Sequence, residues 1–180
     1  MRITASTVRS NTACLCIVAL CFVMLLTGCA NRPEPATTLP VDLFAYDPPA
    51  VAVTGIRAIE RSQAVAFRWV LGPQASLRLN LKEPQEALLR FTLSNPIDGQ
   101  TLTVLVNGKP SAAFAELPAQ PRLTGHTEYR ATLPCAAGAN TVTLAFSRYN
   151  RLDEASTFAP EDKDPLAGML TSLEISPSRP

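Results

Sequence analysis

The sequence predicts an all-β domain, a two-sheet antiparallel β-sandwich, and three observations lead to this fold class. Apolar residues alternate with polar ones in most segments after residue 50, which is the period of strands with one buried face. Turn-forming residues stand between these segments at spacings typical of sandwiches and barrels. With 180 residues, 47% of them apolar, the chain is long enough for one such domain rather than two.

The first 28 residues have the features of a targeting signal. Arg2 and Arg9 precede an uninterrupted apolar run of 14 residues, 13–26, which is too short to span a bilayer comfortably. The run ends in Leu-Thr-Gly-Cys, with the cysteine at Cys29. These four residues in this position resemble the lipobox of bacterial lipoproteins. The resemblance implies cleavage just before Cys29, acylation of its thiol and an anchor in the lipid bilayer.

The same resemblance implies sorting to the outer membrane, on its periplasmic face, because Ala30 rather than Asp follows the lipidated cysteine. Cleavage removes three cysteines, and acylation uses a fourth, so Cys135 is the one free thiol left, for which we expect a buried position. Cleavage also removes two arginines and no acid, which leaves 14 basic and 15 acidic residues. This balance lacks the basic excess that nucleic-acid binding requires.

Residues 29–49 are expected to comprise the lipidated Cys29 and a Pro-rich tether, and residues 50–180 the β-sandwich domain. The segment after the cysteine has five prolines and no sustained period, which is typical of an extended linker. Its end has a reason to pack against the domain, because Val41, Leu43, Phe44 and Tyr46 are costly to leave in water.

Within the domain, each predicted strand shows the alternation of period two. In the first, we expect Phe67, Trp69 and Leu71 on the buried face and Arg68 on the other, which makes Trp69 a core residue. The predicted strands are residues 64–71, 76–81, 87–94, 101–106, 128–133, 140–147 and 169–175.

Asn107 and Gly108 predict a two-residue hairpin turn, because both tolerate a positive φ. Residues 112–117 fit a short helix or an edge strand equally well. With this segment included, eight or nine strands in about 130 residues favour a jelly-roll topology for the sandwich.

The order of features also resembles the galactose-binding-like jelly-roll modules that accompany bacterial envelope-glycan enzymes and polysaccharide-export systems. The resemblance is carried by Phe67-Arg68-Trp69, the Asn107-Gly108-Lys109 turn and an acidic loop that closes at residues 164–168 before the final strand. It implies a jelly-roll fold of galactose-binding-like topology and a non-catalytic, carbohydrate-binding role.

Four residues are predicted to bind a ligand: Arg148, Tyr149, Asn150 and Arg151. They lie together where a strand leaves for the long loop that ends near residue 165. Sugar recognition needs an aromatic surface with hydrogen-bonding groups beside it, and loops at the ends of sandwiches often carry such sites.

The same loop is rich in carboxylates, and Asp162 and Asp164 are the candidate metal ligands. Carboxylate oxygens suit Ca²⁺, and the resemblance to jelly-roll sugar modules implies a structural calcium ion in this loop. Beyond this calcium ion, we expect no cofactor.

We expect no catalysis. His126 is the single histidine, in a segment that predicts an exposed loop, and the sequence has no Gly-x-Ser-x-Gly motif. One histidine and one free cysteine do not make a zinc site, and the loop carboxylates have no spacing that fixes a glycosidase pair. Two functions stay open: a glycan-binding accessory module, or a structural or assembly lipoprotein that binds another envelope protein.

Overall fold

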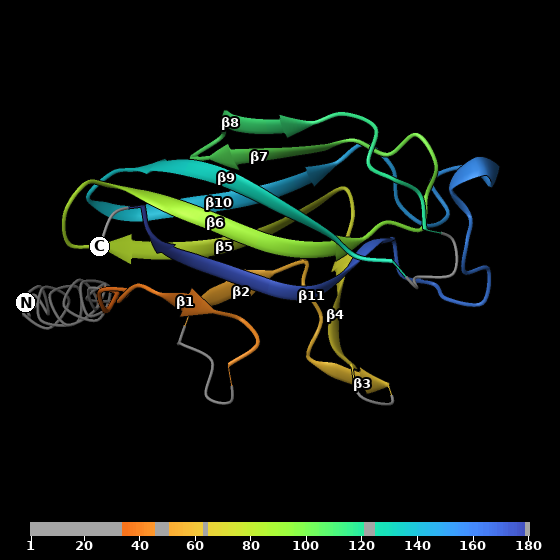
Figure 1. Ribbon diagram of the computed structural model, residues 1–180, viewed down its shortest axis with the longest axis horizontal. Coiled ribbons are helices and arrows are strands. Elements are labelled where there is room, and N and C mark those ends of the chain that lie inside the picture. Colours follow the sequence, from red (N-terminus) through yellow and green to blue (C-terminus); the bar gives the residue numbers. More distant parts are fainter. Residues whose placement is uncertain (1–33, 46–50, 63–64, 121–124, 179–180) are drawn as a thin grey trace, which may run out of the picture. The chain divides into compact units, whose positions relative to one another are not determined.

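The described part of the chain is built from strands, as the alternating sequence predicts (Figure 1). The computed structural model describes residues 34–45, 51–62, 65–120 and 125–178. Residues 1–33, which hold the predicted signal segment and Cys29, lie outside the described residues, as do Tyr46 and residues 121–124. Over the described ranges, no helix is both long enough and apolar enough to cross a membrane.

The first sheet has six strands in the order β3-β4-β11-β6-β9, and β1 pairs with β11 beyond the end of β4. All of its pairings are antiparallel. Its strands are β1 (Val41–Asp42), β3 (Glu60–Ser62), β4 (Val65–Leu71), β6 (Gln85–Ser94), β9 (Thr127–Cys135) and β11 (Leu166–Pro177).

The second sheet has five strands in the order β2-β5-β10-β7-β8, again antiparallel. From β4 onward the chain crosses to the other sheet at every connection except the β7–β8 hairpin, which is the jelly-roll arrangement expected from the sequence. The strands of the second sheet are β2 (Ala52–Thr54), β5 (Gln74–Leu81), β7 (Leu102–Val106), β8 (Lys109–Phe114) and β10 (Gly138–Phe146). One 3₁₀ turn, η1 (Glu154–Ser156), lies outside the described strands, in the loop between β10 and β11.

The predicted strands are confirmed with shifts of a few residues at their ends, and the ambiguous segment after Lys109 is a strand, β8. The hairpin between β7 and β8 turns at Asn107 and Gly108, whose φ angles are 52° and 78°. Positive φ at both positions is the backbone of the predicted two-residue turn. The short strands β1, β2 and β3 were not predicted, because two or three residues are too few to show a period.

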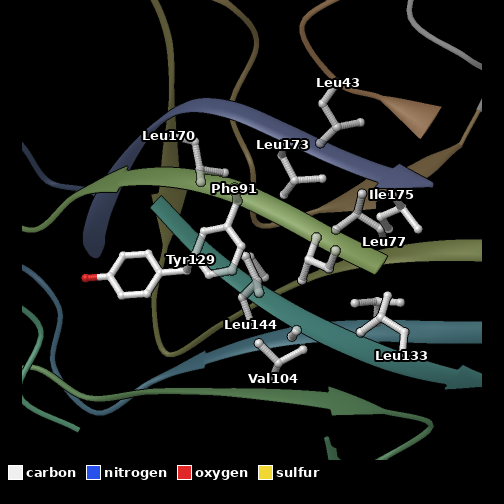
Figure 2. Packing of buried hydrophobic residues seen from close by; sticks show 14 of the residues in the cluster. Leu43, Leu77, Phe91, Val104, Tyr129, Leu133, Leu144, Leu170, Leu173 and Ile175 are labelled. Carbon is white, nitrogen blue, oxygen red and sulfur yellow. The ribbon is translucent and has the colours of Figure 1, made fainter. Parts of the chain in front are cut away.

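The inner faces of the two sheets form one hydrophobic core (Figure 2). Phe91 of β6 stacks on Tyr129 of β9 with ring centres 5.2 Å apart, and Tyr129 meets Phe114 of β8 at 5.0 Å. These rings close the side of the sandwich where β8 and β9 approach, and burial of each large apolar side chain contributes roughly 1.5–3 kcal/mol. Fully buried neighbours include Leu77, Leu79, Leu89, Leu93, Leu102, Leu133, Leu144 and Leu170.

Trp69 does not lie in the core, contrary to the prediction. Val70 is fully buried between the sheets, and neighbouring residues of a strand point to opposite faces. Trp69 is therefore on the outer face of the first sheet, opposite Met169 of β11, where it is half-buried together with Phe67. The two rings meet edge to face at 6.2 Å, and Val65 on the same face is 44% exposed.

An arginine occupies the inner face instead. Arg68 pairs with Leu170, a core residue, so its side chain extends between the sheets. Its guanidinium lies 5.8 Å from the centre of the Phe44 ring, and its Nη1 donates to the carbonyl oxygen of Arg57 at 3.2 Å. Burial lowers the pKa of Arg68. Alternation in the sequence predicts that Arg68 faces solvent. Its contact with the Phe44 ring and its hydrogen bond to the carbonyl oxygen of Arg57 instead stabilise the charged guanidinium on the inner face.

The sandwich begins before the predicted boundary at residue 50. Val41 is fully buried and Leu43 is 2% exposed, and β1 adds to the first sheet through the pairs Val41–Ile175 and Asp42–Glu174. The compact unit accordingly starts at Pro35. Val41 and Leu43, which are costly to leave in water, are thus part of the core, and half-buried Phe44 packs against it.

Cys135, at the end of β9, is a free thiol with 5% exposure. Burial raises its pKa, because the charged thiolate would lose hydration there. The residue therefore behaves as a small apolar side chain, as predicted from the sequence.

Replacement of Leu43 by Ala tests whether the amino-terminal segment is part of the domain. We expect the free energy of unfolding in urea to fall by about 2–5 kcal/mol, because a buried leucine leaves a cavity in a close-packed core. The control Leu152→Ala removes a leucine that is 43% exposed and should change stability by less than about 0.5 kcal/mol. Equal effects of the two changes would contradict the placement of Leu43.

Candidate functional site

Asn150, one of the four residues predicted to bind a ligand, is fully buried at the base of the loop that joins β10 to β11. Its Oδ1 accepts hydrogen bonds from the backbone N–H groups of Phe158 at 3.2 Å and Ala159 at 3.1 Å. Its Nδ2 donates to the carbonyl oxygens of Ala159, Asp162 and Asp164 at 3.0, 3.3 and 3.4 Å. Asn150 thus organises the loop, and its contact with a ligand stays a prediction.

Arg148 is partly occupied by contacts within the same loop. Its Nη1 donates to the hydroxyl of Ser156 at 3.3 Å and lies 3.6 Å from the carboxylate of Asp153. Asp153 in turn caps η1, because its Oδ1 accepts the backbone N–H of Ser156 at 2.7 Å. The hydrogen bonds from Ser156 hold the pKa of Asp153 below its usual value. The side chain of Arg148 is 35% exposed, so part of it is still open to solvent.

The other two predicted residues differ in exposure. Tyr149 is half-buried and packs on the core, with its side chain against Gly72. Arg151 is exposed, with a φ of 68°, and its Nη1 donates to the carbonyl oxygen of Pro160 at 3.3 Å. The four residues lie in one loop, as expected, but each side chain has a contact of its own within the domain.

Asp162 and Asp164, the predicted metal ligands, both face Arg57, which belongs to the segment between β2 and β3. The Nη2 of Arg57 forms an ion pair with Asp164 and lies 3.4 Å from the Oδ1 of Asp162. The hydrogen bond that Arg57 donates to Asp164 raises the pKa of Arg57. A guanidinium therefore lies where the sequence suggested a calcium ion. Within the described ranges, no three His, Cys, Asp or Glu side chains are placed to hold a metal ion.

Two more buried amides fix the loops at this end of the sandwich. Gln100 donates to the carbonyl oxygens of Arg148 and Ala167 at 2.9 and 3.1 Å, and its Oε1 accepts the backbone N–H of Arg148 at 2.7 Å. Asn95 donates to the carbonyls of Ile97 and Leu117 at 2.8 and 3.0 Å. Polar groups that are buried and fully hydrogen-bonded make a loop cluster rigid.

The outer face of the first sheet offers a second candidate, which the sequence analysis did not identify. A shallow hollow of about 230 Å³ lies over β1, β11, β6 and β9, and we call it the outer groove. Its volume is below the roughly 300–1,000 Å³ of pockets that enclose a small molecule. It is lined by Asp42, Arg90, Phe91, Thr92, Glu128, Arg130, Ser172, Leu173 and Glu174.

Four charged side chains form one row of the outer groove. The register places Asp42 opposite Glu174, Glu174 opposite Arg90, and Arg90 opposite Arg130, across four adjacent strands. Like charges therefore face each other in two of the three pairs, which weakens a sheet rather than stabilising it. Among the described residues, no acidic group lies within ion-pair distance of Arg90. Sheet stability therefore does not explain this row of charges.

A second row of the outer groove is made of smaller groups and one carboxylate. Ser172 donates its hydroxyl hydrogen to Thr92 at 2.9 Å, and Thr92 lies opposite Glu128. Glu128 accepts from the Nε of Arg130 at 2.6 Å, with the two side chains 50% and 61% exposed. An ion pair this open to water contributes little to stability, so a ligand can replace its partners at small cost.

Aromatic side chains lie on the same outer face as the outer groove, next to the part of β11 that precedes the groove residues. Met169 and Ser172 point outward on either side of the bulge in β11, and Trp69 of β4 lies opposite Met169. Phe158 from the long loop packs on Trp69 with ring centres 6.2 Å apart and planes tilted by 30°. Trp69, Phe67 and Phe158 thus form a half-buried aromatic cluster beside the polar rows.

His126 is exposed, as predicted, and its Nδ1 lies 2.6 Å from the hydroxyl of Ser94. Ser94 is fully buried at the end of β6 and also donates to the carbonyl oxygen of Gly125. A buried hydroxyl held in this way is not open to a substrate, so the pair has the features of a structural contact between β6 and β9 rather than of a nucleophile and its base.

No family model matches this chain, and no curated protein matches it either. Solved structures of similar fold include a family 35 carbohydrate-binding module from Clostridium thermocellum, with 12% identity over 77% of this chain and 98% of that one, at a TM-score of 0.47. A family 35 module from Paenibacillus barcinonensis has 9% identity over 78% and 100%, at 0.46. A carbohydrate-binding module of Cellvibrio mixtus lichenase 5A, in complex with cellotriose, has 13% identity over 71% and 91%, at 0.42.

Replacement of Asn150 by Ala tests whether this residue organises the loop. We expect the loop amides of Phe158 and Ala159 to exchange hydrogen for deuterium faster and stability to fall by about 1–3 kcal/mol, because buried backbone groups lose their partner. Glu161→Ala, an exposed change in the same loop, should leave both measurements unchanged. Unchanged exchange in Asn150→Ala, together with weaker glycan binding, would instead support the ligand contact predicted from the sequence.

Proposed function

We propose that this protein is a non-catalytic, glycan-binding module held at the bacterial cell envelope by a lipid on Cys29. The observation that carries the proposal is the outer groove, an open hollow of about 230 Å³ lined by hydrogen-bonding side chains from four strands. Adjacent strands are about 4.8 Å apart, so the row from Asp42 to Arg130 extends about 14 Å. That length accommodates more than one sugar ring of an extended polysaccharide.

The chemistry of the outer groove suits sugar hydroxyls. A hydroxyl donates one hydrogen bond and accepts others, so it is best recognised by carboxylates and guanidiniums set side by side. Glu174 and Arg90 are such a neighbouring pair, and Arg130 with Glu128 is another. The exposed part of the aromatic cluster at Trp69 supplies the apolar surface on which a ring face can stack.

The envelope location rests on the sequence of the signal segment and on Cys29. Several acyl chains, each burying many CH₂ groups at about 0.8 kcal/mol apiece, hold a domain at a bilayer without a spanning helix. A module anchored in this way on the periplasmic face of the outer membrane would meet polysaccharides that are made in or exported through the envelope.

Binding can be measured by calorimetry against oligosaccharides from peptidoglycan, lipopolysaccharide and capsular polymers. We expect one class to raise the melting temperature by several degrees at saturation. Arg90→Ala and Arg130→Ala should each weaken its binding about tenfold or more, since a hydrogen bond to a charged group contributes about 1.5–3 kcal/mol. Arg61→Ala, an exposed change on β3, is the matched control and should have no effect.

Two results would contradict the proposal. If no glycan changes the melting temperature of a domain that unfolds cooperatively, the outer groove is not a sugar site. If the protein captures one envelope protein by cross-linking and the groove variants lose that partner, the alternative function as an assembly lipoprotein is correct.

A further inference from the structure

The chain becomes part of the sandwich very soon after Cys29. The backbone N–H of Thr37 donates to the carbonyl oxygen of Asn80 at 2.6 Å, and the N–H of Asn80 donates to the Thr37 hydroxyl at 2.9 Å. The side chain of Asn80 also donates to the carbonyl oxygen of Pro35 at 3.4 Å. From Pro35 onward the chain is therefore fixed to the end of β5, and only residues 30–34 separate this point from Cys29.

Several turns gather at the same end of the sandwich as Asn80, and we call this surface the anchor end. Gly138 and Ala139 pair with Leu81 and Asn80, which places the β9–β10 turn there. The β7–β8 turn and the end of β11 reach it as well, since Asn107 bonds to Thr141 and the N–H of Ser178 donates to Glu86. Figure 1 shows the β5–β6 turn on the left and the long loop with η1 at the opposite end.

The anchor end is a fixed surface. Asn140 is fully buried, and its side chain donates to the carbonyl oxygens of Ala136 at 2.8 Å and Gly138 at 3.0 Å. Its Oδ1 accepts the Nδ2 of Asn107 at 3.0 Å, which joins the β9–β10 and β7–β8 turns. These bonds keep the two turns in place relative to each other.

Chain length sets how far this surface can be from the lipid. Six residue steps lead from Cys29 to Pro35, and a fully extended chain covers at most about 3.6 Å per residue, or about 20 Å in all. The strand β11 alone, with 12 residues, is about 40 Å long. The tether that remains, residues 30–34, is thus shorter than the domain that it holds.

We infer that the anchor end faces the bilayer and stays within about 20 Å of it, and that the long loop between β10 and β11 points away from the membrane. The inference rests on lipid attachment at Cys29, which is part of the proposed function. The partner of this surface is the lipid headgroup layer. The protein then acts at the membrane surface, and a polysaccharide in the outer groove is held close to the bilayer.

Charge does not produce this orientation. Among the described residues, the exposed charges of the anchor end balance, with Lys82, Lys109 and Arg78 against Glu83, Glu86 and Glu34. A balanced surface is neither attracted to nor repelled by anionic headgroups. The orientation therefore depends on the length of the tether, and lengthening the tether should remove it.

The test uses the full lipidated protein in vesicles of phosphatidylethanolamine and phosphatidylglycerol that carry a nitroxide quencher on some headgroups. A fluorophore is attached to Glu83→Cys at the anchor end or to Glu154→Cys in η1, two exposed glutamates at opposite ends. The parent protein gives the background, because buried Cys135 labels poorly. We expect at least twofold stronger quenching at position 83 than at position 154.

A matched variant carries 20 Gly and Ser residues inserted after Glu34. Such a linker adds about 25 Å of average reach, so the difference between the two labels should largely disappear. Equal quenching of the two labels with the native tether, or a difference that the insertion leaves intact, overturns the inferred orientation. A protein that fails to sediment with vesicles whether or not Cys29 is replaced by Ala overturns the lipid anchor itself, and the orientation with it.

Discussion

The pairing of β11 with three other strands is the interaction on which the rest of the structure depends. β11 binds β6 along one edge and β4 followed by β1 along the other. Its inward residues, such as Leu173 and Ile175, belong to the core, while Ser172 and Glu174 line the outer groove. A slip of one residue would exchange these two sets, so the burial of the inner face also fixes the chemistry of the outer one.

The two ends of the sandwich are held by buried amides. Asn150 and Gln100 bind backbone groups at the loop end, and Asn140 does the same at the anchor end. Each of these side chains is fully buried and satisfied, so it replaces backbone pairing that irregular segments cannot supply. Arg57 adds an ion pair to Asp164 in the long loop. This loop therefore has a defined conformation through its own polar contacts, with carboxylates neutralised by a guanidinium.

Sequence alternation was sufficient to predict the sandwich, because most strands bury one full face. It was misleading at Trp69 and Arg68, since β4 lies near the edge of its sheet and an arginine can extend inward over an aromatic ring. The outer groove could not be predicted. Alternation along each strand can place Arg90 and Glu174 on exposed faces, but only the register between β6 and β11 shows that they are neighbours. The polarity of Asn150 predicts a contact with a ligand, whereas its burial gives it hydrogen bonds to the backbone of the long loop.

The buried thiol of Cys135 has a consequence for how the protein matures. The described residues contain one cysteine, and its sulfur lies in the apolar interior next to the end of β9. Under the proposed cleavage before Cys29 and lipidation of its thiol, Cys135 is the one thiol left. Its burial keeps that thiol away from a second cysteine, so the proposed mature protein would not depend on disulfide formation for its stability.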